Sequence, residues 1–379
     1  MLKDKKERIK HYLAHCKLHS NYAWFAEEWG VRPETVRTFV KNQQLPNLKI
    51  NVQSKRNDVP LAEQLKKVIA NKRRTVVELA DTFDVSPKKV LSALKELQSK
   101  NVIVDHFENG EVCLAKEIQP VDKPLVIDTK KYAEKEFCFG VVADTHIGSK
   151  YERLDVLGAL YDKFVDVGVK DVYHCGNWID GECRFNQYDI YVRGVEGQVT
   201  NFIEKYPQRK GITTHLISGD DHEGWYVQRE HINIGQYMQT KAEAAGRKDL
   251  IDLGYIERDI AFKAAKGQSI VRVIHAGGGS TYAISYTAQK YVESLQGGEK
   301  PAIVLIGHYH KFDYGYPREV HTIQPGCTED QTPFMRKKKI QAMVGGCIVW
   351  VKQNELGIFT SVKVEWIPFY DKKFYQYKW

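Results

Sequence analysis

Five short apolar runs, each followed at once by polar residues, constrain the fold of this chain more than any other feature. The runs are rich in β-branched and aromatic residues and are bounded by glycine or polar residues, as buried strands are. They span residues 137–143, 172–175, 215–218, 270–274 and 302–306. Because open α/β sheets place their ligand sites at the carboxyl ends of strands, the polar clusters are expected to meet at one edge.

The clusters consist mostly of histidine and aspartate. They are Asp144-x-His146, Gly176-Asn177-x-x-Asp180, Gly219-x-Asp221-His222-Glu223, His275 and Gly307-His308-x-His310. Imidazole and carboxylate without cysteine favour Mn²⁺, iron or Zn²⁺ over Ca²⁺ or a thiolate zinc site. About seven ligands exceed the needs of one ion and suit two ions roughly 3.5–4 Å apart. The pattern predicts a binuclear hydrolytic centre in which a metal-activated water attacks phosphorus in line.

Each cluster also has a simpler interpretation. A single Asp or His is often a helix cap or a buried polar residue, but five clusters at strand ends are not explained that way. Glu223 is interpreted as the start of the next helix. The basic run Arg336-Lys-Lys-Lys339 is either a contact to substrate phosphates or a solvated loop.

The ordered motifs resemble those of the calcineurin-like metallophosphoesterases over residues 137–350. The opening motif, Ala143-Asp-Thr-His-Ile-Gly148, is most similar to that of the double-strand-break repair nucleases within this superfamily. The resemblance implies an α/β (α+β) fold, in which a two-sheet β-sandwich is flanked by helices. It also implies two divalent metal ions, with Mn²⁺ as the first expectation and iron or Zn²⁺ as alternatives. A homodimer or a partner ATPase would suit such a nuclease.

The resemblance further implies roles for individual residues. One ion would be held by Asp144, His146 and His310, and the other by Asp221, His275 and His308, with position 177 bridging the two. His222 matches the family's histidine beside the scissile phosphate, and Asp180 matches the carboxylate that orients it in the phosphatase branch. A carboxylate behind an imidazole fixes its tautomer and supports its charged form.

Two positions depart from the family pattern. The usual bridging aspartate is Asn177, and the usual asparagine ligand is Asp221, with Asp220 as an extra residue after the glycine. A carboxylate can give one oxygen to each of two ions, whereas a carboxamide offers one oxygen and a non-ligating NH₂ group. Three explanations stay open: Asp221 has taken the bridging role, the second ion binds weakly, or Asn177 is an inactivating substitution.

The first 116 residues carry all of the chain's excess positive charge. They hold 22 Lys+Arg against 14 Asp+Glu, whereas the remaining 263 hold 34 of each. Charge of this kind is the electrostatic footprint of a protein that binds a polyanion, and DNA is the expected partner.

Two stretches of this basic region have the pattern of a helix-turn-helix. Residues 21–40 hold two apolar helical faces separated by a glycine turn, with Pro33 in the first turn of the second helix. The pattern recurs at residues 75–94, where Ser86 is the expected N-cap of the second helix. The buried stripe expected in that helix is Val90, Leu91, Leu94 and Leu97.

Residues 102–107 and 111–115 are expected to pair as a hairpin around Asn109-Gly110. Helices followed by such a hairpin resemble a winged helix, whose recognition helix would lie in a DNA major groove. A module for protein contacts is the alternative, and a solvated basic face is the alternative for any single cation. The expected phosphate contacts are Arg32, Arg37, Lys41, Lys72, Arg73, Arg74, Lys88, Lys89 and Lys95.

These patterns divide the chain into four parts. The expected parts are a helix-turn-helix module at 1–45, a winged-helix module at 60–116, a linker at 117–136 and a metallophosphoesterase catalytic domain at 137–379. A polar stretch at 43–60 is expected to join the two modules. Further strands are expected at 320–323, 342–351 and 357–366.

Composition fits a globular protein, since 42% of the residues are hydrophobic and 11% aromatic. Seven cysteines without C-x-x-C spacing indicate a reducing compartment. The charged start, Met1-Leu-Lys-Asp-Lys-Lys, matches neither a signal peptide nor a membrane span, so a cytoplasmic protein is expected.

The sequence as a whole favours a metal-dependent phosphodiesterase acting on DNA, a nuclease whose basic modules hold the duplex and deliver a backbone phosphate to two ions. The alternative enzyme is a phosphomonoesterase or protein phosphatase, which the pair of Asp180 and His222 suggests. The non-enzymatic alternative is a DNA-binding protein with a degraded phosphoesterase site, which Asn177 favours.

Overall fold

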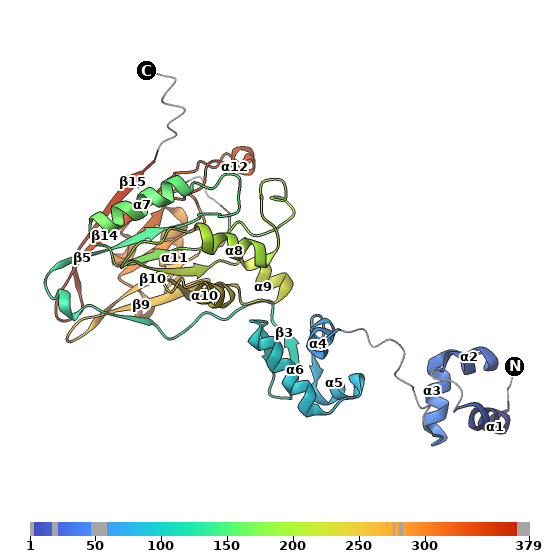
Figure 1. Cartoon of the computed structure of the whole chain (residues 1–379). Coiled ribbons are helices and arrows are strands. Elements are labelled where there is room, and N and C mark those ends of the chain that lie inside the picture. The colour runs from blue at the N-terminus through green and yellow to red at the C-terminus, as the bar shows by residue number, and fades with distance from the viewer. Residues whose placement is uncertain (1–3, 17–21, 47–58, 276, 280–282, 370–379) are drawn as a thin grey trace. The chain divides into compact units, whose positions relative to one another are not determined.

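A computed structural model describes residues 4–16, 22–46, 59–275, 277–279 and 283–369 (Figure 1). The chain divides into two compact units, residues 1–64 and 65–379. Parts of the expected modules at 1–45 and 137–379, and most of the stretch expected to join the two modules, lie outside the described residues.

In the first unit, two helices flank the glycine turn expected within residues 21–40. The unit's helices are α1 (Lys5–His15), α2 (Ala23–Trp29) and α3 (Pro33–Asn42). Gly30 ends α2 in the left-handed conformation, with φ 63°, and Pro33 opens α3. Glycine favours the left-handed end of a helix, and proline favours the first turn of the next helix. The buried side chains between the helices are Tyr12, Phe25, Ala26, Trp29, Val36 and Val40.

Three helices and a small sheet follow. The elements are α4 (Leu61–Ile69), β1 (Arg74–Thr75), α5 (Val76–Phe83), α6 (Pro87–Ser99), β2 (Val104–His106) and β3 (Glu111–Leu114), with sheet order β1-β3-β2. The expected hairpin is present, since β2 and β3 pair antiparallel. Ser86 caps α6 as expected by accepting from Lys89 N. The expectation for Leu91 is wrong: it is 45% exposed, because Ala93 and Leu94 take the inner face one turn before Leu97.

The remainder contains two six-stranded sheets, as the predicted fold class requires. The first has the order β15 (Phe359–Pro368), β14 (Gly345–Gln353), β5 (Glu136–Val142), β6 (Asp171–His174), β7 (Thr213–Ser218) and β8 (Leu250–Tyr255). The second has the order β12 (Phe312–Gly315), β13 (His321–Pro325), β11 (Ile303–Ile306), β10 (Gln268–Ile274), β9 (Glu257–Lys263) and β4 (Leu125–Asp128). Each strand predicted from an apolar run is present.

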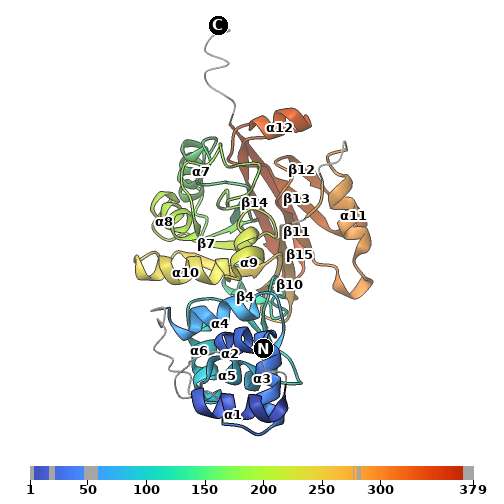
Figure 2. The same ribbon diagram turned by 90° about the vertical axis from the view of Figure 1, so that its right-hand side faces the viewer.

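Helices cover the outer faces of both sheets (Figures 1 and 2). The first sheet is covered by α7 (Leu154–Asp166), α8 (Val195–Lys205), α9 (Gly224–Glu230) and α10 (Ile234–Ala244), and the second by α11 (Tyr286–Ser294). Helix α12 (Pro333–Lys338) lies at one edge of the sandwich. The burial of both faces of β11 explains why its sequence is apolar throughout. Ile303 and Leu305 pack between the sheets, whereas Val304 and Ile306 pack beneath α11. A strand buried on both faces has no polar alternation.

Residues 117–136, expected to be a linker, are partly built into the sandwich. Strand β4 pairs parallel with β9, with Leu125 opposite Ile260. The preceding hairpin module is also tied to the sandwich by backbone hydrogen bonds. Ile103 N donates to His231 O, and Asn233 N donates to Asn101 O.

Candidate metal centre

The parallel strands of both sheets bring the polar clusters to one edge. Strands β5, β6 and β7 run parallel in the first sheet, and β10 and β11 run parallel in the second. The clusters occupy the turns that follow these five strands. The residues with left-handed backbone there are Asp144, His146, Asn177, His222, His308 and His310, with φ between 41° and 89°. Such strain costs roughly 1–3 kcal/mol per residue and collects at functional sites.

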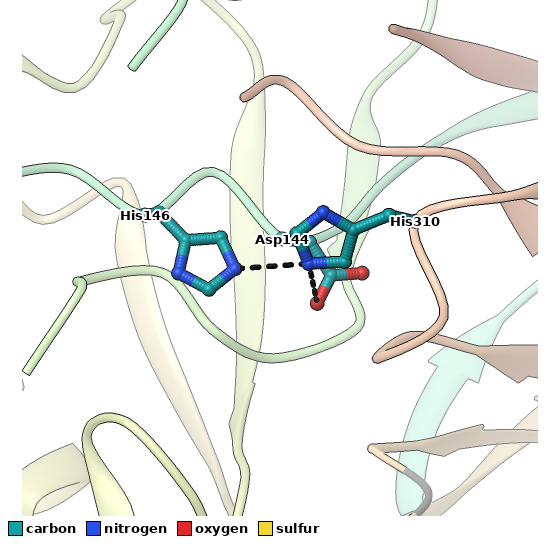
Figure 3. Close-up of side chains that lie close together, drawn as sticks. All are labelled: Asp144, His146 and His310. Carbon is teal, nitrogen blue, oxygen red and sulfur yellow. Dashed lines mark hydrogen bonds and ion pairs between the residues drawn. The ribbon is translucent and has the colours of Figure 1, made fainter. Parts of the chain in front are cut away.

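The first predicted ligand set is brought together. One ligand atom from each of Asp144, His146 and His310 lies within 4.8 Å of the others. Nε2 of His146 is 3.1 Å from Nε2 of His310, which is 3.7 Å from Oδ1 of Asp144 (Figure 3). The Asp144 carboxylate also accepts from His308 N at 2.9 and 3.1 Å. Burial raises the pKa of Asp144 despite the surrounding histidines.

The second predicted set, Asp221, His275 and His308, also converges. Nε2 of His275 lies 3.1 Å from one Asp221 oxygen, and Nδ1 of His308 lies 3.2 Å from the other. The opposite ring nitrogens are fixed by backbone carbonyls: His275 Nδ1 donates to Cys175 O, and His308 Nε2 donates to Gly278 O, both at 2.6 Å. These bonds leave a lone pair of each ring facing Asp221.

Glycines before the clusters make room for His275. A Cβ at Gly176 would lie 2.2 Å from His275 Nδ1, and one at Gly219 would lie 2.4 Å from its Cδ2. A Cβ at Gly307 would lie 1.9 Å from Cys175 O, the acceptor of the His275 hydrogen bond. The glycine that opens three of the clusters is therefore a packing requirement of the second ligand set.

Asp180 orients two histidines, whereas one was expected. Its Oδ1 lies 3.0 Å from His146 Nδ1 and 3.2 Å from His222 Nδ1, and its carbonyl accepts from His222 Nδ1 at 2.7 Å. Burial would raise the pKa of Asp180, but the two histidines outweigh it and lower that pKa. Burial opposes the charged form of His222, yet Asp180 and Asp221 raise its pKa well above the ordinary value. His222 therefore favours the proton-bearing form.

The residues present fit divalent metal ions. Among the described residues, the buried atoms without a hydrogen-bond partner include Asn177 Oδ1, Asp221 Oδ1, His275 Nε2 and His308 Nδ1 of this centre. The two ring nitrogens face the Asp221 carboxylate. Leaving such atoms buried without a partner costs roughly 1–3 kcal/mol each. Coordination of cations by these four atoms would satisfy them, and the Asp144, His146 and His310 set offers a further group of ligand atoms.

The model of the calcineurin-like phosphoesterase superfamily domain matches residues 138–344. The chain belongs to this superfamily. Its members usually bind divalent metals, and the ligand groups described above are the candidate sites.

No branch within the superfamily is assigned by the remaining similarities. No curated protein matches the chain. Three solved structures are similar at low identity. They are a novel archaeal phosphodiesterase (13% identity, TM-score 0.32, 60% of this chain and 100% of that chain), Vps29 with Zn²⁺ from Entamoeba histolytica (12%, 0.28, 62% and 100%) and GAP50 from Plasmodium (14%, 0.37, 63% and 90%).

Two glutamates of the phosphoesterase site were not predicted in these positions. Oε1 of Glu223 accepts from Asn177 N and Gly219 N, both at 2.9 Å, and so joins the loops after β6 and β7. The Oε2 atom of Glu329 is 3.8 Å from His146 Nε2, and its Oε1 atom accepts a hydrogen bond from Ser149 Oγ at 2.8 Å. Burial raises the pKa of each glutamate to about 7. Glu223 is also the N-cap residue of α9, as its simpler interpretation required.

A cleft of about 470 Å³ opens over the phosphoesterase centre. Its lining includes Asn177, His222 and two members of each ligand set: His146 and His310 of the first, and Asp221 and His308 of the second. This volume is typical of a small-molecule or single-residue subsite. The lip of the cleft carries Phe185 and Phe334, both exposed.

The predicted DNA contacts of the second unit, Lys72, Arg73, Arg74, Lys88, Lys89 and Lys95, are not among the residues that line the cleft. All except Arg74 are exposed, and Arg74 is half-buried. Arg73 lies over the Phe107 ring, 3.8 Å from its centroid, so this cation is partly engaged within its own module. No helix in the described part of the chain has the length and apolarity needed to cross a bilayer.

Proposed function

We propose that this metallophosphoesterase is a metal-dependent phosphodiesterase that cleaves DNA and belongs to the branch of the double-strand-break repair nucleases. The observation that carries the proposal is the convergence of two ligand triads at a cleft that members of each triad and His222 line. The Mn²⁺ assignment rests on mixed imidazole and carboxylate donors. A homodimer or a partner ATPase remains a prediction for a nuclease of this branch.

Divalent ions held by the two triads would activate a water and neutralise charge on the phosphate oxygens. His222 would donate a proton to the leaving group. Its Nδ1 is engaged by Asp180, so Nε2 is left for the leaving oxygen. Because Asp180 and Asp221 favour the charged ring, His222 is a suitable acid for a leaving alkoxide.

The second part of the proposal gives DNA binding to the basic modules. Residues 61–114 have the element order of a winged helix, with α6 in the place of the recognition helix. Lys88, Lys89 and Lys95 of α6 are exposed, and no acidic residue occupies its first turn. Phosphate contacts from such lysines position a duplex without reading its sequence.

A second candidate is a phosphomonoesterase. The contact between Asp180 and His222 favours it, because the family resemblance associates this pair with the phosphatase branch. A degraded, DNA-binding relative is the third candidate, and Asn177 favours that one.

The test is cleavage by the full chain, loaded with Mn²⁺, of labelled linear, nicked and single-stranded DNA, beside chromogenic monoester and diester substrates. Asn177→Asp is assayed in parallel, and His222→Asn serves as the variant that should keep metal binding but lose turnover. Cleavage of DNA and preference for the diester support the proposal. Preference for the monoester supports the phosphatase, and fewer than about two ions per chain with no hydrolysis supports the degraded site.

A further inference from the structure

Two phenylalanines stand exposed at the lip of the metal cleft. Phe185, in the loop after β6, is 55% exposed, and Phe334, in α12, is 43% exposed. Their rings stack with centroids 5.3 Å apart and an interplanar angle of 20°. Both line the same cleft as His222. A loop and a helix that are far apart in sequence therefore contribute the two rings of one stacked, solvent-exposed aromatic pair.

This surface continues inward to the centre. Trp225 lies edge-on to Phe185, with centroids 5.4 Å apart, and its ring lies 4.9 Å from that of His222. Grouped exposed aromatic rings lose the hydrophobic stabilisation that burial would give them, and such groups mark binding surfaces. The neighbouring rings of Phe334, Phe185, Trp225 and His222 therefore extend from the exposed lip of the cleft to the predicted site of hydrolysis.

Positive charge lies beside the same lip. Lys338 lines the cleft, and its Nζ lies 6.0 Å from the Phe334 ring centroid. It belongs to the run Arg336-Lys-Lys-Lys339, whose role the sequence left open. The acidic residues of the lining are Asp180, Asp189, Asp221 and Glu329. Flat rings beside cations suit a ligand that has both a π-face and a phosphate.

We propose that Phe185 and Phe334 form a stacking platform for an unpaired nucleobase next to the scissile phosphate, with Lys338 holding the adjoining backbone phosphate. The inference deepens the proposed function by naming its substrate class as a single strand or a frayed end. The faces of bases inside a duplex are covered by neighbouring base pairs, so only an unpaired base can lie on these rings. A peptide bearing a phosphorylated tyrosine is the competing ligand, and the basic amino-terminal modules favour DNA over it.

The test measures stacking directly, without turnover. A single-stranded oligonucleotide carrying 2-aminopurine is titrated with the full chain in EDTA, and fluorescence quenching is followed beside anisotropy. We expect quenching that Phe334→Ala and Phe185→Ala each abolish, with affinity lowered roughly tenfold, since stacking of one base on a ring is worth about 1–3 kcal/mol. Phe334→Leu keeps the apolar area and should still lose the quenching.

Matched controls separate the platform from general binding. Tyr188→Ala changes an aromatic residue of the same loop that is 87% exposed and outside the cleft lining, so quenching should persist. An oligonucleotide with an abasic position in place of 2-aminopurine should bind the Phe334→Ala protein and the unchanged chain equally. Unchanged quenching in both phenylalanine variants overturns the inference, and so does displacement of the oligonucleotide by a phosphotyrosine peptide at lower concentration.

The two proposals fail in different ways. Quenching that depends on Phe334, combined with no cleavage of any DNA in Mn²⁺, would leave the platform standing and remove the nuclease. DNA cleavage that is indifferent to both phenylalanines would remove the platform and leave the nuclease.

Discussion

Gly176 offers the sharpest test of how the centre is built, because an added methyl group there would meet a predicted metal ligand. Its left-handed backbone, with φ +89°, places a Cβ 2.2 Å from Nδ1 of His275. The same nitrogen donates to Cys175 O at 2.6 Å. Gly176→Ala must therefore push the His275 ring aside and break this hydrogen bond.

Gly168 is the matched control. Its φ is +81°, and no heavy atom lies within 4 Å of an added Cβ. Left-handed backbone costs an alanine about 1–2 kcal/mol, and the reduced entropy of the unfolded chain offsets about 0.4–1 kcal/mol of that. Gly168→Ala should therefore lower the free energy of unfolding by roughly 0–1.6 kcal/mol.

Gly176→Ala carries the same backbone cost and two further ones. Loss of the buried hydrogen bond costs about 1–3 kcal/mol, and overpacking costs about 1–3 kcal/mol. The difference between the two variants is thus roughly 2–6 kcal/mol. A ligand displaced by about 1 Å should also lower hydrolysis on the order of 100-fold.

Urea denaturation followed by circular dichroism measures the stability difference, and equilibrium dialysis with Mn²⁺ measures the bound ions per chain. The expected result is a modest loss of stability with full metal binding for Gly168→Ala, and a large loss with weaker metal binding for Gly176→Ala. Equal stability and equal metal content in the two variants would refute the reasoning, because His275 would then not be locked against position 176.

Three further outcomes are expected. Asn177→Asp should tighten binding of one Mn²⁺ by about tenfold in equilibrium dialysis, because a carboxylate offers an oxygen to each ion; unchanged affinity argues against a bridging position. Burial raises the pKa of Asp252 to about 6. Protonation of this carboxyl therefore contributes stability that is fully present below about pH 4 and is lost as pH rises through 6. Relative to Asp252→Asn, the unchanged chain should therefore lose roughly 2 kcal/mol of unfolding free energy between pH 4 and 7.5, and parallel pH profiles in urea would contradict this. Changing Lys88 and Lys89 together to alanine should reduce the slope of log affinity for duplex DNA against log salt by about 2, measured by anisotropy, whereas an unaltered slope removes both from the interface.

The strands and the convergence of the clusters were predictable because both are local patterns. A run such as Ile303–Ile306 is apolar because two layers cover it, and that requirement is visible in sequence. The polar residues that follow such runs lie together because parallel strands end at the same edge. Both ligand triads meet for this reason, although their residues span Asp144 to His310.

The supporting carboxylates could not be predicted, because their roles depend on contacts between distant segments. Glu329 accepts from Ser149, which is 180 positions away, and no apolar run precedes it. Glu223 was interpreted as a helix start, and it is one, but the loops it joins are known only from the fold. Strand β4 was missed because Leu125–Asp128 is short and pairs with residues near Ile260. The local exception is Leu91, where helical spacing already assigned the inner face to Ala93 and Leu94.

The electrostatics of the centre bear on the missing bridging carboxylate. Glu223 and Glu329 are buried behind the ligands, and burial raises the pKa of both to about 7. Burying carboxyl groups in this way costs free energy unless positive charge compensates them. Divalent cations in the cleft would supply that charge and would favour the ionised form of both groups. The neutral Asn177 therefore offers one oxygen where a carboxylate would offer two, while the buried carboxyl groups that would attract cations stay in place. We infer that the substitution alters how the ions share ligands more than whether they bind.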